Sequence, residues 1–317
     1  MVEQARPLVG SGWRLWLVVV LLAALFASVG LFGVYRYLDN YWLYRGFAPP
    51  HDPAYVRIHG SEQVIRVSSP ALGGRTQEVF VYLPPGYGNS RARRYPVFYL
   101  LHGSPGRPLA FLLTVQLGVL VDELVALGRM QPLILVMPNG STGTFTDKEW
   151  ANGVHANEAW ESFVSKDVVH MIDARYRTIP TGKGRAIGGL SEGGYGALNL
   201  ALHHPGEFRV VESWSGYQRA RAIASIFGGD RRRLAYNSPS AYLPRVARQL
   251  RARHVFVWFY SSGEDSFLLE NLAFARELSR HRVRHAFFVE HGRHTWVIWR
   301  ANARTALLVA AARVAHD

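Results

Sequence analysis

The stretch GGLSEGGYGA, residues 188–197, places five glycines around one serine and one glutamate. The residues that lead into it, GRAIGGLS, are typical of a short strand, and EGGYGALNLALHHP is typical of a helix that Pro205 ends. Residues 189–193, GLSEG, therefore have the pattern G-x-S-x-G between a strand and a helix. In that setting glycines permit a tight turn that raises the serine above the carboxyl edge of a sheet. The stretch predicts Ser191 as a nucleophile.

Two phosphate-binding loops and an ordinary glycine-rich loop are the alternatives for this stretch. A Walker loop needs G-x-x-x-x-G-K-[ST], but Gly follows Lys183. A dinucleotide loop needs G-x-G-x-x-G, and in GKGRAIGG the third glycine comes one place late, on the wrong side of the strand. The strand–turn–helix setting favours the nucleophile.

The rest of the chain predicts an α/β fold with a mostly parallel, doubly wound sheet. Strand patterns with turn signals behind them are VIRVSS, EVFVYLP, YPVFYLLHG, PLILVMPNG, HVFVWFYSSG and HAFFVEHG. Helical spacing of apolar residues is seen in AFLLTVQLGVLVDELVALGRM and WESFVSKDVVHMIDARY. Alternating strands and helices build such a sheet, and its chemistry lies at the carboxyl ends of the strands.

A serine nucleophile needs a base and an acid that orients the base. In this fold both follow the serine, in the order acid then histidine, each on a loop after a strand. YSSGEDS provides Asp265, with Glu264 beside it, and VEHGRHTW provides His294, with His291 nearby. The alternative role for Asp265 is that of an N-cap of the helix that starts at Phe267. The His291–His294 spacing lacks a third ligand, so no metal is predicted.

An oxyanion hole is the remaining requirement of this chemistry. The backbone N–H of Glu192 is predicted as one donor, because it follows the nucleophile. LLHGSPG, residues 100–106, offers the second donor from the backbone of Gly103 or Ser104.

Several segments resemble the putative esterase family of α/β-hydrolases, which includes esterase D, the enterochelin esterases and the antigen 85 mycolyltransferases. The similar segments, in order, are YPVFYLLHGSPG, FVSKDVVHMIDARYRTIP, RAIGGLSEGGYGALNLALHHPGEF, SSGEDSFLLEN and GRHTWVIWR. The resemblance runs from about Val64 to the C-terminus and implies an α/β-hydrolase fold without a cofactor. It implies the same three residues: Ser191 as nucleophile, Asp265 as acid and His294 as base.

Two features set the chain apart within that family. Glu192 stands where many members have methionine or another neutral residue. SWSGY, residues 213–217, and TDKEWANG, residues 146–153, look like segments of an actinobacterial membrane-linked subgroup.

The N-terminal region predicts a membrane anchor. Residues 15–35, LWLVVVLLAALFASVGLFGVY, contain no ionisable group except the last tyrosine and are long enough to cross a bilayer as a helix. We expect a flank at 1–14, the anchor at 15–35, a linker at 36–53 and a catalytic domain at 54–317, facing outward from the cell membrane. A cleaved signal peptide is the alternative, because SVG at 28–30 offers small residues at a cut.

Composition excludes some classes of protein and leaves others open. The 317 residues include no cysteine, which excludes disulfides and cysteine-ligated zinc. The net charge of +13 indicates either ordinary solvated arginines or attraction to an anionic surface. The basic run at 231–233 is short and no recognition motif accompanies it, so no nucleic-acid partner is predicted. Nothing indicates an oligomeric state.

Acidic and aromatic residues near the predicted site suggest what the substrate carries. The predicted substrate-binding residues are Asp147, Glu149, Trp150, Glu158, Trp214 and Trp296. With Glu192, one or two of these acids would hold an ammonium group, as in an aminoacyl ester of a phospholipid, while the tryptophans, Trp160 among them, would line a pocket. The alternatives are solvated or arginine-paired acids and core tryptophans.

Three functions remain at this point. The first is a membrane-anchored, extracytoplasmic serine esterase that acts on a lipid-linked or envelope ester. The second is an acyltransferase of the mycolyltransferase type, and the third is a non-catalytic binding module on the same fold.

Overall fold

The computed structural model describes residues 12–89, 91–143, 146 and 148–315 of the chain. The chain divides into two units, residues 1–48 and residues 49–317. The first contains one helix, and the second contains all of the sheet and the predicted site.

Helix α1 runs from Gly12 to Tyr44, so it includes the predicted anchor and extends nine residues beyond it. Its part from Trp13 to Tyr44 is apolar enough to cross a membrane, with a mean hydropathy of 2.7 over its most apolar window. No part of that window is buried within the described protein. A helix of this length and composition, near the N-terminus, has the properties of a membrane span and of a signal sequence.

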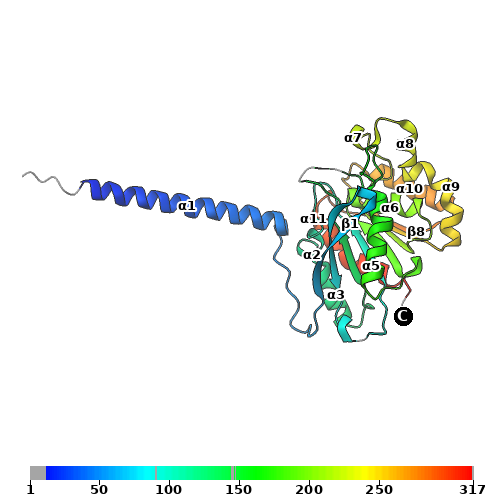
Figure 1. Cartoon of the computed structure of the whole chain (residues 1–317), viewed down its shortest axis with the longest axis horizontal. Coiled ribbons are helices and arrows are strands. Elements are labelled where there is room, and N and C mark those ends of the chain that lie inside the picture. The colour runs from blue at the N-terminus through cyan, green and yellow to red at the C-terminus, as the bar shows by residue number, and fades with distance from the viewer. Residues whose placement is uncertain (1–11, 90, 144–145, 147, 316–317) are drawn as a thin grey trace, which may run out of the picture. The chain divides into compact units, whose positions relative to one another are not determined.

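The second unit is built on a mostly parallel eight-stranded sheet (Figure 1). Its strands are β1 Ser61–Ser69, β2 Arg75–Leu83, β3 Val97–Leu101, β4 Ile134–Pro138, β5 Arg185–Gly189, β6 Val210–Trp214, β7 Phe256–Ser262 and β8 Arg284–Glu290. The spatial order is β1-β2-β4-β3-β5-β6-β7-β8. The pairs β1–β2 and β2–β4 are antiparallel, and every pair from β4 to β8 is parallel. This confirms the predicted fold class.

The central strands are mostly apolar and wholly buried because both faces of the sheet are covered. All residues of β3, β4, β5 and β6 are buried. In β3, Tyr99 and Leu101 pack into one core cluster, and Phe98 and Leu100 pack into the cluster on the opposite face. Alternate residues of the same strand therefore contribute to the core on each face of the sheet.

Helices cover each face of the sheet (Figure 1). The core cluster on one face receives side chains from α4 Trp160–Ser162, the π-helical turn η3 Phe163–Val168, α5 Val169–Arg175, α6 Glu192–His203, α9 Pro239–Ala252 and α10 Leu268–Arg280. The cluster on the other face receives them from α2 Ala110–Leu113, α3 Leu117–Ala126 and α11 Trp296–Ala311.

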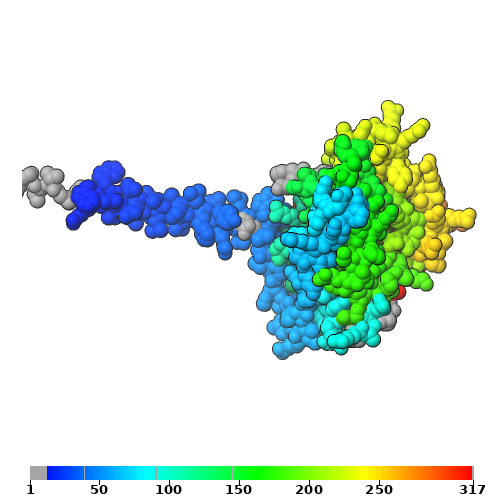
Figure 2. All heavy atoms as spheres, in the orientation of Figure 1, coloured from blue at the N-terminus to red at the C-terminus, as the bar shows by residue number. Residues whose placement is uncertain are grey.

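Local details differ from the helical patterns of the sequence. The helix expected over AFLLTVQLGVLVDELVALGRM is two helices, α2 and α3, because Gln116 adopts a left-handed conformation with φ 62° that interrupts it. The helix expected over WESFVSKDVVHMIDARY is continuous but contains the π-helical turn η3. Short helices α7 Ala224–Phe227 and α8 Arg231–Tyr236 follow β6 and project from the body, in yellow in Figure 2.

The parallel strands end at one edge of the sheet, and the loops behind them carry the predicted residues. His102, Gly103 and Ser104 follow β3, Ser191 follows β5, and Asp265 and His294 follow β7 and β8. The loop after β6 begins at Ser215. Residues spread over almost 200 positions of sequence are thereby brought to one place.

Candidate active site

Ser191 lies on a strained turn between β5 and α6. Its φ of 55° and ψ of −119° lie outside the regions that side chains favour. Its N–H donates to the Trp214 carbonyl oxygen at 2.9 Å, which ties the turn to the end of β6. A Cβ on Gly189 or Gly193 would lie 2.3 or 1.8 Å from the Leu101 carbonyl oxygen. Glycines are therefore required where this turn meets the end of β3.

Ser191, His294 and Asp265 form a hydrogen-bonded line. His294 Nε2 lies 2.8 Å from Ser191 Oγ, and His294 Nδ1 lies 2.8 Å from Asp265 Oδ2. Ser191 and His294 are 103 residues apart in the sequence. The Asp265 side chain is almost completely buried, whereas that of His294 is 29% exposed. A buried carboxylate on Nδ1 holds the histidine with Nε2 as the acceptor toward the serine hydroxyl.

Asp265 is not the N-cap of α10, since Phe267 occupies that position. Asp265 Oδ1 nevertheless accepts a hydrogen bond from the Phe267 N–H at 3.0 Å, just before α10 begins. The second oxygen of the same carboxylate faces His294, so the backbone contact fixes the side chain that meets the histidine. The neighbouring Glu264 is exposed and pairs with Arg293 at 2.8 Å, and His291 is exposed.

Two aromatic rings hold the His294 ring from different sides. Phe267 approaches it edge-on with the ring centroids 5.9 Å apart, and Trp299 of α11 does so at 5.1 Å. Trp296 packs edge-on against Trp299 at 4.9 Å and is half-buried. Trp296 is therefore linked to the His294 ring through Trp299.

The loop after β3 passes directly beside the nucleophile. A Cβ on Gly103 would lie 3.2 Å from Ser191 Cβ, so the glycine backbone is in contact with the turn. The next peptide bond, between Ser104 and Pro105, is cis. Glu192 is the first residue of α6, where backbone N–H groups point out of the helix. The predicted oxyanion donors thus lie on two segments that flank Ser191.

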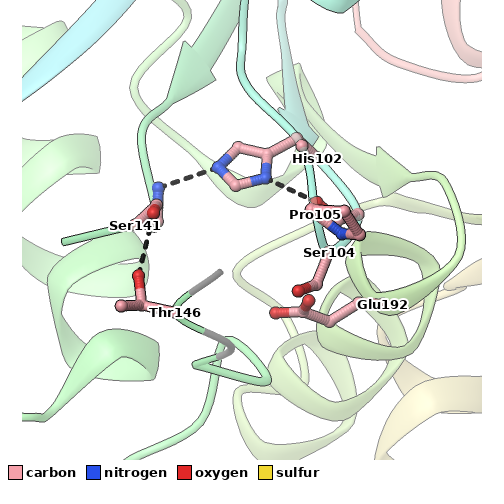
Figure 3. Close-up of a pocket in the computed structure, with 9 residues that line it drawn as sticks. His102, Ser104, Pro105, Ser141, Thr146 and Glu192 are labelled. Atoms are coloured by element: carbon pink, nitrogen blue, oxygen red, sulfur yellow. Dashed lines mark hydrogen bonds between the residues drawn. The ribbon is translucent and has the colours of Figure 1, made fainter. Parts of the chain in front are cut away.

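His102 anchors this loop from the interior. Its Nε2 accepts a hydrogen bond from the Gly140 N–H at 3.0 Å, and its Nδ1 donates to the Gly103 carbonyl oxygen at 2.9 Å (Figure 3). Burial lowers the pKa of His102 to about 4, against the opposing effect of its hydrogen bonds with Gly103 and Asn139. The ring is therefore neutral near pH 7, which both of its hydrogen bonds require. The sequence analysis did not single out this residue.

A small pocket lies between the loops after β3 and β4 and the start of α6, and Ser191 is not among its lining residues. Its lining comprises His102, Gly103, Ser104, Pro105, Gly106, Gly140, Ser141, Thr146 and Glu192. Figure 3 shows the carboxylate of Glu192 and the side chain of Ser104 close together in this space. Glu192 is only 6% exposed, and its Oε1 accepts a hydrogen bond from the Glu149 N–H at 2.9 Å. The pocket thus presents one carboxylate next to Ser191.

Glu149 and Glu158 do not line this pocket. Glu149 is completely buried, and its Oε2 accepts a hydrogen bond from the Tyr217 hydroxyl at 2.6 Å. Glu158 forms ion pairs with Lys148 at 2.9 Å and Arg75 at 3.3 Å, as the arginine-paired alternative has it. Asp147 lies outside the described residues. Only Glu192 among the described acids of this group lines the pocket.

Three of the predicted tryptophans are interior residues. Trp150 donates from Nε1 to the His102 carbonyl oxygen at 2.9 Å, and Trp214 donates to Glu212 Oε2 at 2.9 Å. Trp160 donates to Glu158 Oε2 at 2.6 Å. All three are at most 1% exposed, so their rings pack the core instead of offering a surface to a substrate.

One cluster of potential metal ligands occurs among the described residues, away from the triad. Asp52, His59 and Asp122 place their ligand atoms within 4.8 Å of one another. His59 Nδ1 pairs with Asp52 Oδ2 at 2.9 Å, and Asp122 accepts hydrogen bonds from the Gly60 N–H and the Tyr82 hydroxyl. These groups already supply partners to one another.

Comparison with known proteins places this geometry in context. Residues 69–308 match the model of a family described as "Putative esterase". The endo-1,4-beta-xylanase/feruloyl esterase of Xylanibacter ruminicola is 33% identical over 153 residues, which cover 47% of this chain and 21% of that protein. Esterase Rv1288 of Mycobacterium tuberculosis is 28% identical over 250 residues, which cover 69% of this chain and 52% of that protein. The chain therefore spans between a fifth and about half of the length of these relatives.

A similar architecture is found in a solved ferulic acid esterase structure. It superposes with a TM-score of 0.72 at 24% sequence identity, and covers 81% of this chain and 99% of that one. At this identity the similarity shows the fold.

Proposed function

Because this chain belongs to the Esterase family, we propose that it is a serine hydrolase of carboxylic esters with Ser191, His294 and Asp265 as its catalytic residues. The observation that carries the proposal is the line of two 2.8 Å contacts from Asp265 through His294 to Ser191. The order of the three residues along the chain and their positions after β5, β7 and β8 support the same assignment.

The geometry supports acyl transfer in two steps. His294 Nε2 takes the proton of Ser191 Oγ as that oxygen attacks the ester carbonyl, and the resulting imidazolium donates the proton to the departing alcohol. Water then attacks the acyl-enzyme, with His294 again as base, and releases the acid. Asp265 stabilises the imidazolium and holds its orientation.

The oxyanion of each tetrahedral intermediate needs donors next to Ser191. We assign these to the backbone N–H of Glu192 and to that of Gly103 or Ser104. The position of Glu192 at the N-terminus of α6 supports the first, since a helix N-terminus carries partial positive charge. The contact of Gly103 with the Ser191 turn supports the second.

Replacement of the nucleophile tests the proposal. Ser191→Ala should lower kcat/KM for p-nitrophenyl acetate by about 10⁴-fold or more, because only binding and oxyanion stabilisation remain. His294→Ala should behave alike, whereas the matched change of its exposed neighbour, His291→Ala, should keep most activity. Turnover by Ser191→Ala at the wild-type rate, with no labelling of wild type by a fluorophosphonate probe, would refute the assignment.

For the substrate, we propose an ester whose acyl group carries an ammonium and whose alcohol belongs to a membrane lipid, such as an aminoacyl-phosphatidylglycerol. The Glu192 carboxylate in the pocket beside Ser191 supports the ammonium, because a charge-assisted hydrogen bond there contributes about 1.5–3 kcal/mol. The apolar helix α1 supports the lipid, since it would keep an outward-facing body at the membrane. Hydrolysis would restore the negative charge of the headgroup.

Matched alanyl and propionyl esters of one alcohol test the ammonium. The wild type should prefer the alanyl ester roughly tenfold to a hundredfold in kcat/KM, the range that one such hydrogen bond supplies. Glu192→Gln should remove this preference and leave propionyl turnover within a few-fold, because the proposed oxyanion donor is the backbone. Equal values for the two esters in the wild type would leave a generic esterase.

A further inference from the structure

The loop that precedes α4 contains a strained pair of residues, Glu149 and Trp150. Their φ angles are 51° and 48°, so two successive side-chain-bearing residues adopt the left-handed conformation. Such a conformation is unfavourable for a residue with a side chain, and persists only where the surroundings hold it in place. Contacts of the Trp150 ring hold this pair in place, and the Glu149 backbone N–H contacts Glu192.

Trp150 is the part that is held. Its Nε1 donates to the His102 carbonyl oxygen, and its ring packs edge-on against the His102 ring at 5.0 Å. The ring fills the space above two glycines: a Cβ on Gly140 or Gly196 would lie 2.4 or 2.8 Å from the nearest ring atom. Trp150 is thus wedged between the loop after β4 and the nucleophile helix α6.

Glu149 is the part that presents groups to the site. Its backbone N–H donates to Glu192 Oε1 at 2.9 Å, and its own carboxylate accepts from the Tyr217 hydroxyl at 2.6 Å. The left-handed φ sets the direction of that N–H relative to the side chain. The backbone of the fully buried Glu149 therefore holds the Glu192 carboxylate, while the Glu149 side chain is held by the Tyr217 hydroxyl.

Tyr217 connects this arrangement to the catalytic histidine. Its ring stacks on Tyr195 of α6 with centroids 4.7 Å apart, and packs on Phe267 at 4.9 Å. Phe267 is the ring that meets His294 edge-on. The loop that carries Tyr217 is fastened by Asn271, which donates to the Gly216 carbonyl oxygen and accepts from Gln218 Nε2, both at 2.8 Å.

We propose that Glu149 is a positioning residue that sets the orientation of Glu192 and so the acyl-group preference of the enzyme. The Tyr217 hydroxyl holds the Glu149 side chain, the wedged Trp150 holds its backbone, and the N–H between them aims Glu192 into the pocket. The proposal rests on the proposed function for its kinetic consequence, but its structural claim, that Tyr217 holds the Glu149 N–H on Glu192, stands independently.

Tyr217→Phe is the sharpest variant, because it removes one oxygen and keeps the ring that stacks on Tyr195. Two measurements apply to it: hydrogen–deuterium exchange of the Glu149 amide, and the ratio of alanyl to propionyl kcat/KM. We expect faster exchange and a three- to tenfold smaller ratio, the fold-change of about one hydrogen bond. Propionyl turnover should stay within about threefold, because Ser191, His294 and Asp265 are untouched.

Glu149→Gln and Glu149→Ala complete the series. The glutamine can still accept from the Tyr217 hydroxyl and should retain most of the ratio, whereas the alanine should lose it. Leu307→Ala, a buried side chain of α11 in the core cluster on the face of the sheet opposite Trp150, controls for general loss of packing and should leave the Glu149 amide unchanged. Unchanged exchange of this amide in Tyr217→Phe would overturn the proposal.

The two proposals fail in different ways. A wild type without esterase activity refutes the function while the exchange measurement still decides the role of Glu149. A wild type that prefers the alanyl ester, with a preference that Glu192→Gln removes and Tyr217→Phe leaves intact, refutes the positioning role alone.

Discussion

Asp265 shows how one carboxylate serves two purposes at a functional site. One oxygen accepts a hydrogen bond from the Phe267 N–H just before α10 and the other faces His294, so the backbone fixes the carboxylate that contacts this histidine. Its neighbour Glu264 has neither contact and pairs with Arg293 at the surface.

Asp265→Asn should lower kcat by roughly 10²–10⁴-fold, because an amide can hold the wrong histidine tautomer and cannot stabilise the imidazolium. Glu264→Gln is the matched control and should stay within about twofold, since exposed ion pairs contribute little. Steady-state kinetics on p-nitrophenyl acetate decide between them. If Glu264→Gln were the damaging change, the acid would have to be reassigned.

The His102 ring is buried and forms hydrogen bonds with Gly103 and Gly140, so its protonation state affects the stability of these loops. Its folded pKa of about 4 is below the 6.5 usual for histidine. The unfolded chain therefore binds more protons between these pH values, so the stabilisation is fully present above about pH 6.5 and is lost as the pH falls toward 4.

The free energy of unfolding should accordingly fall on the order of 3 kcal/mol between pH 7 and pH 4 through this residue. His102→Gln should show a smaller fall over the same interval, because glutamine does not titrate. Urea denaturation at several pH values measures the difference. Parallel curves for the two proteins would show that His102 is not a source of the acid sensitivity.

A buried acid joins several helices on the side of the sheet that α6 covers. Glu161 of α4 accepts hydrogen bonds from His203 at 2.9 Å and His204 at 2.8 Å, at the end of α6. The His203 ring stacks on Tyr236 of α8 with centroids 4.2 Å apart and on Tyr242 of α9 at 4.7 Å. Burial alone would raise the pKa of Glu161, but the hydrogen bonds from the two histidines outweigh it and lower the pKa to about 2.

Glu161→Gln should destabilise the fold by about 3 kcal/mol near pH 7, because replacing the buried carboxylate leaves the polar groups that donate to it without full partners. Glu277→Gln, which removes a more exposed pair with Arg280, should cost less than about 1 kcal/mol. Since the folded pKa of Glu161 is depressed, the difference between wild type and Glu161→Gln should be full above about pH 4.5 and shrink as the pH falls toward 2. Chemical denaturation across this range measures it; a difference that grows on acidification would contradict the assignment.

The chain as a whole combines a catalytic unit that has its own core with a long apolar helix. Both core clusters and all of the candidate catalytic residues lie within residues 49–317. Apolar side chains cover α1 on all sides, as expected of a helix that meets lipid.

A chain that begins at His51 should therefore be soluble and should hydrolyse small esters with the kcat/KM of the full-length protein, whereas the full-length protein should sediment with membranes. Ultracentrifugation of cell extracts and turnover of p-nitrophenyl acetate measure both properties. Protein found in the medium with an N-terminus near Leu31 would show a cleaved signal instead. An insoluble short form would show that the helix is needed for folding.

The predictions that needed only the amino-acid sequence concern local patterns. The GLSEG turn follows from a strand, a helix and glycines within about ten residues, and the order Ser191, Asp265, His294 follows from loops behind apolar runs. Such features depend on neighbouring residues and on the rule that parallel strands end at one edge, so they can be derived before any contact is known.

Only the tertiary structure decided which polar and aromatic residues are interior. Glu149 contacts Glu192 from 43 positions away and Tyr217 from 68, and no local pattern distinguishes it from an acid that faces a substrate. Trp150 likewise looks like a pocket residue until Gly140 and Gly196 are seen to make room for its ring. Burial and hydrogen-bond partners are properties of packing between distant segments, which is why the fold could be predicted from the sequence while the surroundings of Glu192 could not.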